Sequence, residues 1–187
     1  MGPGQPVGAV LDANVLYSAF LRDVLLRLAA AGLFQPYWTE RIHEEWTRNL
    51  LAKRPDIVPA VLSRTRAGMD RHFPGALVVG FEPLEAQLAG VHPGDQHVAA
   101  AALKAGARRI VTHNLKHFPA EALEPYGLVP ESPDDFVSQL IQADPAMTGA
   151  AVVAHRTGLQ RPAYTEAEYA AAFRRAGLTK SASLLWP

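Results

Sequence analysis

The stretch VGAVLDANVL at residues 7–16 joins a short apolar run to a carboxylate. Residues 7–11 have the length and composition of a buried β-strand, and Asp12 follows them directly. Burying a charge is costly unless the charge is paired or bound to a metal. In open α/β sheets, the end of a strand that leads into a helix is also where ligands bind. This stretch therefore predicts a parallel sheet with a polar site at the end of its first strand.

The composition is that of a folded domain. The chain has 187 residues, of which 49% are hydrophobic and 19% charged, so it has ample material for a core and too little charge for a disordered protein. Lys plus Arg and Asp plus Glu both number 18, and this balance neither favours nor excludes a nucleic-acid partner. The lack of cysteine excludes disulfides and thiolate metal sites. Because there is no long apolar run and no signal-peptide pattern at the start, we expect a cytoplasmic protein without a membrane span.

The expected elements alternate between strand and helix. Strands are expected at 7–11, 34–38, 76–81 and 109–112, and helices at 15–31, 40–53, 56–71 and 96–105. This order favours a mostly parallel sheet covered by helices on both faces. Further on, Ser132-Pro133 and the capping box from Thr165 to Glu168 predict helix starts. We therefore expect one α/β domain at 5–130 and a helical C-terminal extension, 131–187, packed on it.

Three acidic positions fall at comparable places in this scheme. Asp12 ends the first strand, Glu44 and Glu45 lie on the helix after the second, and Asp95 opens the Ala-rich helix. The last strand brings residues 112–114 to the same edge if it neighbours the first. Carboxylates that share a crevice raise one another's pKa, and a divalent cation relieves this. Oxygen ligands without cysteine favour Mg²⁺ or Mn²⁺, which suits phosphodiester hydrolysis by a metal-activated water.

Three separated motifs occur in a recognisable order. VLDANVLYSAF, EEWTRNL and GDQHVAAAALKAGARRIVTHNLKHFP resemble the PIN-domain nucleases, in particular the branch of VapC-type toxins, over residues 7–120. The resemblance implies a Rossmann-like α/β/α sandwich and a Mg²⁺- or Mn²⁺-dependent ribonuclease. It matches the family's acids to Asp12, Asp95 and one of the two adjacent glutamates. We favour Glu45 over Glu44, because Glu45 directly precedes WTRNL, and adjacent helical residues point about 100° apart.

The sequence departs from the family pattern after the last strand. Many members carry a fourth acid there, and the two corresponding positions are Asn114 and His117. Asn114 retains a carbonyl that could serve as a ligand, whereas His117 offers nitrogen without negative charge. A site with three carboxylates should bind a second metal ion more weakly, so the number of metal ions stays open.

Other residues are expected around the acids. Asn14 is expected to hold Asp12, and the supporting or substrate-binding set also includes Ser18, Thr112 and Arg48. Each has an ordinary alternative: a helix cap or turn, a plain helix position for Ser18, or an exposed basic face. The histidines near the acids are expected at a loop or at the substrate rim rather than around zinc: His92, His97, His113 and His117.

The leading hypothesis is a metal-dependent endoribonuclease that acts as the toxin of a type II toxin–antitoxin pair. Asp12, Glu45 and Asp95 would bind the metal with help from Asn114, RNA would be the substrate, an antitoxin the partner, and a homodimer stays open. One alternative is an inactive PIN relative that binds RNA, suggested by the missing fourth acid. A phosphatase of the haloacid-dehalogenase type is disfavoured, because that chemistry needs a second Asp where this chain has Asn14.

Overall fold

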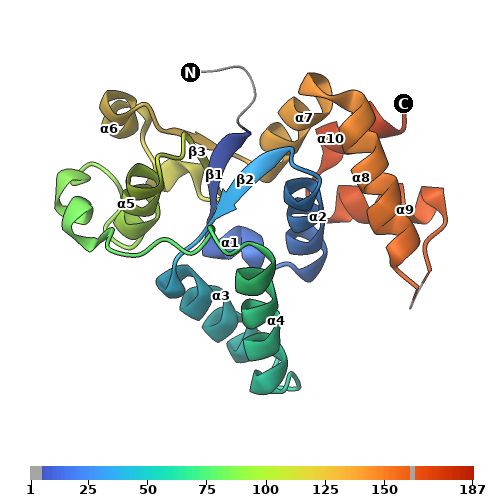
Figure 1. Cartoon of the computed structure of the whole chain (residues 1–187), viewed down its shortest axis with the longest axis horizontal. Coiled ribbons are helices and arrows are strands. Elements are labelled where there is room, and N and C mark those ends of the chain that lie inside the picture. The colour runs from blue at the N-terminus through green and yellow to red at the C-terminus, as the bar shows by residue number, and fades with distance from the viewer. Residues whose placement is uncertain (1–5, 161–162) are drawn as a thin grey trace.

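A four-stranded parallel sheet forms the centre of the computed structural model, which describes residues 6–160 and 163–187 (Figure 1). The strands are β1 (Val7–Leu11), β2 (Phe34–Tyr37), β3 (Arg109–Val111) and β4 (Val129–Glu131), in the spatial order β2-β1-β3-β4. β1 lies inside the sheet, and its last three residues are fully buried. A strand covered on both faces is apolar without alternation, which is why residues 7–11 form an unbroken apolar run.

Helices cover both faces of this sheet. The first part of the chain contains α1 (Ala13–Leu16), α2 (Ala19–Ala30), α3 (Glu40–Lys53), α4 (Pro59–His72), α5 (Gln96–Ala105) and α6 (Ala120–Leu123), with short 3₁₀ turns η1 (Glu82–Gln87), η2 (Leu115–His117) and η3 (Glu124–Tyr126). Figure 1 shows α5 on one side of the strands and α2 on the other; α5 packs on β1 and β3, and α2 packs on β2. This confirms the expected α/β/α sandwich. Within the described ranges, no helix has the length and apolar character needed to cross a membrane.

The single helix expected at 15–31 is two helices. The chain leaves α1 at Tyr17, and Ser18 adopts extended backbone with φ −76° and ψ 115°. The Ser18 hydroxyl oxygen then accepts a hydrogen bond from the Leu21 N–H at 3.4 Å and caps α2. The apolar spacing continues across this break, so periodicity alone missed a cap that starts a new helix.

The expectation of a strand at 76–81 is wrong, and a strand at the other edge was missed. Leu77 forms only an isolated bridge with Trp38. Gly80, with φ +69°, then turns the chain away into η1. The fourth strand is β4, which contains Pro130 and is only three residues long, so neither its composition nor its length marked it. Proline is tolerated there because β4 is an edge strand.

The C-terminal part of the chain is helical, and both expected helix starts are confirmed. The Ser132 hydroxyl oxygen accepts from the Asp135 N–H at 3.1 Å, and Thr165 and Glu168 form a capping box. The elements are α7 (Pro133–Ala143), α8 (Pro145–Gly158), α9 (Glu166–Arg175) and α10 (Thr179–Leu185).

Aromatic side chains hold these helices to the sheet domain. Phe136 of α7 meets Phe34 of β2 edge-to-face, with 4.9 Å between ring centroids. Phe20 of α2 packs against Tyr169 and Phe173 of α9 at 5.6 and 5.8 Å. β4 lies across the expected boundary between 130 and 131, and the division into two domains stays a prediction.

The contact between Phe34 and Phe136 generates a test of this packing. Replacing Phe136, which is 2% exposed, by Ala should lower the free energy of unfolding by about 3–5 kcal/mol, because it leaves a cavity between β2 and α7. Urea unfolding followed by circular dichroism measures this change. The matched control Leu184→Ala, at an exposed position of α10, should change stability by less than about 0.5 kcal/mol. Equal effects of the two variants would contradict the packing.

A buried histidine predicts how stability depends on pH. Burial, with a smaller contribution from Arg27, lowers the pKa of His155 from 6.5 to about 4, and its Nδ1 lies 2.5 Å from the Tyr169 hydroxyl oxygen. Below pH 6.5 the unfolded chain binds a proton at His155 that the folded chain does not bind. The free energy of unfolding should therefore fall as the pH drops from 6.5 towards 4.

Urea unfolding at pH 7.5 and pH 5 measures this effect. His155→Gln should show a smaller loss of stability than wild type, whereas the exposed His72→Gln should show the wild-type loss. The prediction fails if His155→Gln retains the full loss between the two pH values.

Candidate active site

Asp12 lies at the carboxyl end of β1 and is only 3% exposed. The neighbouring strand β3 ends at Thr112, whose hydroxyl donates to Asp12 Oδ2 at 2.6 Å. The Asn14 amide nitrogen donates to the same oxygen, also at 2.6 Å. Oδ1 of Asp12 receives no side-chain hydrogen bond from the described residues. The carboxylate is thus held by one oxygen and presents the other.

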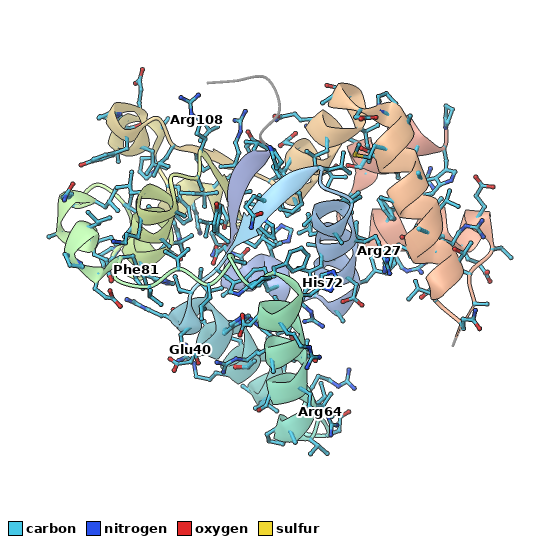
Figure 2. All side chains as sticks on the ribbon, viewed as in Figure 1. Arg27, Glu40, Arg64, His72, Phe81 and Arg108 are labelled. Atoms are coloured by element: carbon cyan, nitrogen blue, oxygen red, sulfur yellow. The ribbon has the colours of Figure 1, made fainter. Side chains whose placement is uncertain are left out.

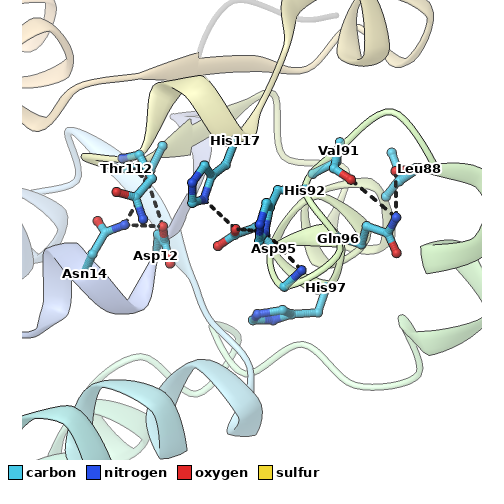
Figure 3. A network of polar contacts seen from close by, with 12 residues as sticks. Asp12, Asn14, Leu88, Val91, His92, Asp95, Gln96, His97, Thr112 and His117 are labelled. Atoms are coloured by element: carbon cyan, nitrogen blue, oxygen red, sulfur yellow. Dashed lines mark hydrogen bonds and ion pairs between the residues drawn. The ribbon is translucent and has the colours of Figure 1, made fainter.

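Asn14 ties the ends of β1 and β3 together (Figure 3). Its amide nitrogen also donates to Thr112 Oγ1 at 3.0 Å, and its amide oxygen accepts from the His113 N–H at 3.0 Å. The Asn114 N–H donates to Thr112 Oγ1 at 3.0 Å, while the Asn114 side chain is half-buried and makes no hydrogen bond within the described residues. The strand ends are therefore fixed relative to each other by side chains.

Asp95 precedes α5 and faces Asp12 across the site. Its Oδ2 lies 2.8 Å from His117 Nδ1 and 3.1 Å from His92 Nδ1. The negative charge of Asp95 reaches Asp12, where it raises the pKa of the Asp12 carboxyl. The structure thus brings together two acids that are more than eighty positions apart in the sequence.

Glu45 of α3 is the third acid, and it faces inward while its neighbour Glu44 is exposed. Its Oε1 lies 3.2 Å from Nε2 of His97 and 3.6 Å from Nε of Arg41. His97 is completely buried in the first turn of α5, and neither of its ring nitrogens has a well-aligned hydrogen-bond partner in the described part of the chain. The positive charge of His97, when protonated, would act on both Glu45 and Asp12.

The electrostatics of the acids differ. Burial is the main cause that raises the pKa of Asp12, and the charge of Asp95 raises it further, whereas the hydrogen bond from Thr112 opposes them. Burial alone would also raise the pKa of Glu45, but His97 together with nearby arginines holds that pKa below its usual range.

The donor set fits a divalent cation. A buried carboxyl group with a raised pKa, facing a second carboxylate, lacks enough positive charge around it. The groups that face each other are oxygen donors with imidazoles beside them, and the chain has no cysteine that could supply a thiolate ligand. Asp12 and Asp95, with Glu45 across from them, are the residues that would hold the ion.

Some supporting residues lie where they were expected and others do not. Thr112 and Asn14 contact Asp12 directly. Ser18 caps α2 and makes no hydrogen bond to the acids among the described residues. Arg48 is exposed on α3, and its charge contributes to the lowered pKa of Glu45.

Three of the histidines contact the acids: His92 is exposed in the loop before α5, His117 is half-buried at the end of η2, and only His97 lies away from any loop or rim. His97 is buried against Glu45, and His92 and His117 both contact Asp95. His113 is exposed and enters the site only through its backbone N–H. The position of His97, two residues after Asp95 at the start of an apolar helix, is the sequence feature that could have indicated its burial.

Comparison with known proteins identifies the family. A family model described as "PIN domain" matches residues 8–116, which is more than half of the chain, so this chain belongs to the PIN-domain family. A second model, "VapC50 C-terminal domain", matches residues 133–186 and places the chain with the VapC-like members. Both matches confirm the resemblance inferred from the motifs.

A curated relative has the name VapC50, as the second family model does. It is "Putative ribonuclease VapC50" of Mycobacterium tuberculosis (strain ATCC 25618 / H37Rv), 47% identical over 62 residues. The aligned stretch spans 33% of this chain and only 36% of the relative's length. No solved structure matches the chain.

The buried carboxylate of Asp12, whose pKa is raised, leads to a prediction about stability. In metal-free buffer with a chelator, Asp12→Asn should raise the free energy of unfolding, because burying a neutral amide costs less than burying a carboxylate and an amide is not repelled by Asp95. Urea unfolding measures the change, and Asp56→Asn, at an exposed position of the same residue type, should leave stability within about 0.5 kcal/mol. A destabilised Asp12→Asn would mean that the folded protein already compensates this charge.

Proposed function

We propose that this protein is a metal-dependent endoribonuclease and the toxin of a type II toxin–antitoxin pair. The observation that carries the proposal is that the charges of Asp95 and His97 both act on the buried Asp12, while His97 also contacts Glu45 of α3. Membership of the PIN-domain family and the name of the Mycobacterium tuberculosis relative support RNA as the substrate. The VapC50 C-terminal match supports the role as a toxin with an antitoxin partner.

The residues have distinct tasks in this proposal. Asp12, Asp95 and Glu45 would hold Mg²⁺ or Mn²⁺, and the ion would supply an activated water and positive charge for the phosphate. Thr112 and Asn14 fix Oδ2 of Asp12, which leaves Oδ1 available as the ligand oxygen.

Two residues near these acids, Asn114 and Arg48, are assigned to the site and to RNA binding, and the charges around Glu45 keep it ionised. Asn114, half-buried with a free amide in the described structure, completes the site on the β3 side. Arg48 is exposed beside Glu45 and supplies positive charge for an RNA phosphate. The ionised state of Glu45, favoured by its lowered pKa, keeps it ready to bind a cation at neutral pH.

The adjacent glutamates of α3 provide the sharpest test. Glu45→Gln should lose at least about 100-fold in cleavage of a structured RNA with Mn²⁺, because it removes an inward-facing carboxylate, whereas Glu44→Gln should cleave like wild type. Asp12→Asn and Asp95→Asn should also be inactive, and a chelator should stop cleavage by wild type. Fluorescence of an end-labelled RNA gives the rate.

The same variants test the role as a toxin. Expression of wild type and Glu44→Gln should slow bacterial growth, and Glu45→Gln should not. Cleavage that survives in Asp12→Asn, or that persists without divalent metal, would overturn the nuclease assignment. RNA binding without any cleavage by wild type would favour a regulatory relative.

A further inference from the structure

Asp95 is shared by two histidines from separate parts of the chain. His92 lies in the loop before α5, and His117 ends η2. Both present Nδ1 to the same Asp95 oxygen, at 3.1 and 2.8 Å, and the three donor atoms lie within 4.8 Å of one another (Figure 3). We call these three residues the His-Asp-His cluster.

The backbone holds this arrangement in place. The His92 N–H donates to the His117 carbonyl oxygen at 3.0 Å, which ties the two loops together. The two imidazole rings stack, with 4.3 Å between centroids and 16° between planes. The rings are nearly parallel, and both Nδ1 atoms point towards the same Asp95 oxygen.

The contacts of His92 call for a proton or a cation between its Nδ1 and the Asp95 carboxylate. The Gly94 N–H lies 3.2 Å from His92 Nδ1 and donates to it, so this nitrogen acts as an acceptor. It also faces the Asp95 oxygen at 3.1 Å, and a carboxylate oxygen is an acceptor too. Two acceptors at this distance repel each other unless a proton or a cation lies between them.

Donor-atom spacing also fits a metal ion. Donor atoms about 3 Å apart are what neighbouring positions around a cation give when the metal–ligand bonds are about 2.0–2.2 Å long. Neutral imidazole is a common ligand for transition metals and a poor one for Mg²⁺, which prefers oxygen. The chemistry of His92 and His117 therefore differs from that of the carboxylates Asp12 and Glu45.

We propose that His92, Asp95 and His117 form a nitrogen-bearing site that binds a divalent transition metal such as Mn²⁺ in preference to Mg²⁺. Asp95 connects this site with Asp12, whose pKa responds to its charge. The inference rests on the proposed nuclease site for its biological use, but it concerns metal binding that is measured without RNA.

Pulsed electron paramagnetic resonance of Mn²⁺ bound to the full-length protein tests the proposal. Wild type should show coupling of Mn²⁺ to imidazole nitrogen, and calorimetry should give at least about tenfold tighter binding of Mn²⁺ than of Mg²⁺. His117→Asp should weaken the nitrogen coupling and reduce the preference for Mn²⁺ about tenfold, and His92→Gln should weaken the coupling as well. The control His72→Gln, exposed on α4, should behave like wild type.

The outcomes separate the two proposals. Mn²⁺ bound to wild type without nitrogen coupling would mean that the histidines only position Asp95, and it would overturn the inference whatever the variants do. An unchanged metal preference in a folded His117→Asp, checked by circular dichroism, would overturn it too. Nitrogen coupling in a protein that cleaves no RNA would uphold the metal site and reject the nuclease. Cleavage without nitrogen coupling would do the reverse.

Discussion

The parallel pairing of β1 with β3 is the constraint on which the site depends. Val10 and Leu11 pair with Ile110 and Val111, so Asp12 and Thr112 leave the sheet side by side. The hydrogen bonds among Asp12, Thr112 and Asn14 then fix both strand ends where the chain turns into α1 and η2. A shift in this register would separate Asp12 from the residue that orients it.

The outer elements carry the remaining groups to this edge. α3 follows β2 and presents Glu45, and α5 packs on β1 and β3 and presents Asp95 and His97. Figure 2 shows how densely side chains fill the space between these elements and the strands. The site is therefore assembled from four segments, the end of β1, α3, α5 and the segment from β3 to η2, all of which contribute residues to the apolar core or pack on it. Burial of Asp12 beside Asp95 is tolerated because the apolar core below stabilises the fold.

The groups that surround Glu45 differ from those that surround Asp95. On the α3 side, Arg41 and His97 favour the ionised form of Glu45. On the η2 side, His117 occupies one of the two positions where the resemblance to PIN domains predicts a fourth acid, and it contacts Asp95 instead of adding a negative charge. The same fold thus places Glu45 beside Arg41 and His97, and Asp95 beside His92 and His117.

The sequence alone determined the sandwich, because apolar runs and helix caps are local. It also predicted the three acids and the preference for Glu45 from the order of the motifs, and the structure shows Glu45 half-buried and Glu44 exposed. The sequence did not determine which segment forms the edge strand of the sheet. Residues 76–81 are apolar enough for a strand but form only an isolated bridge, whereas β4 pairs in parallel with β3. Nor did it reveal that His92 and His117 meet at Asp95. Hydrogen bonds and ring stacking between residues 25 positions apart depend on how the loops close over α5, and only the tertiary structure decides that.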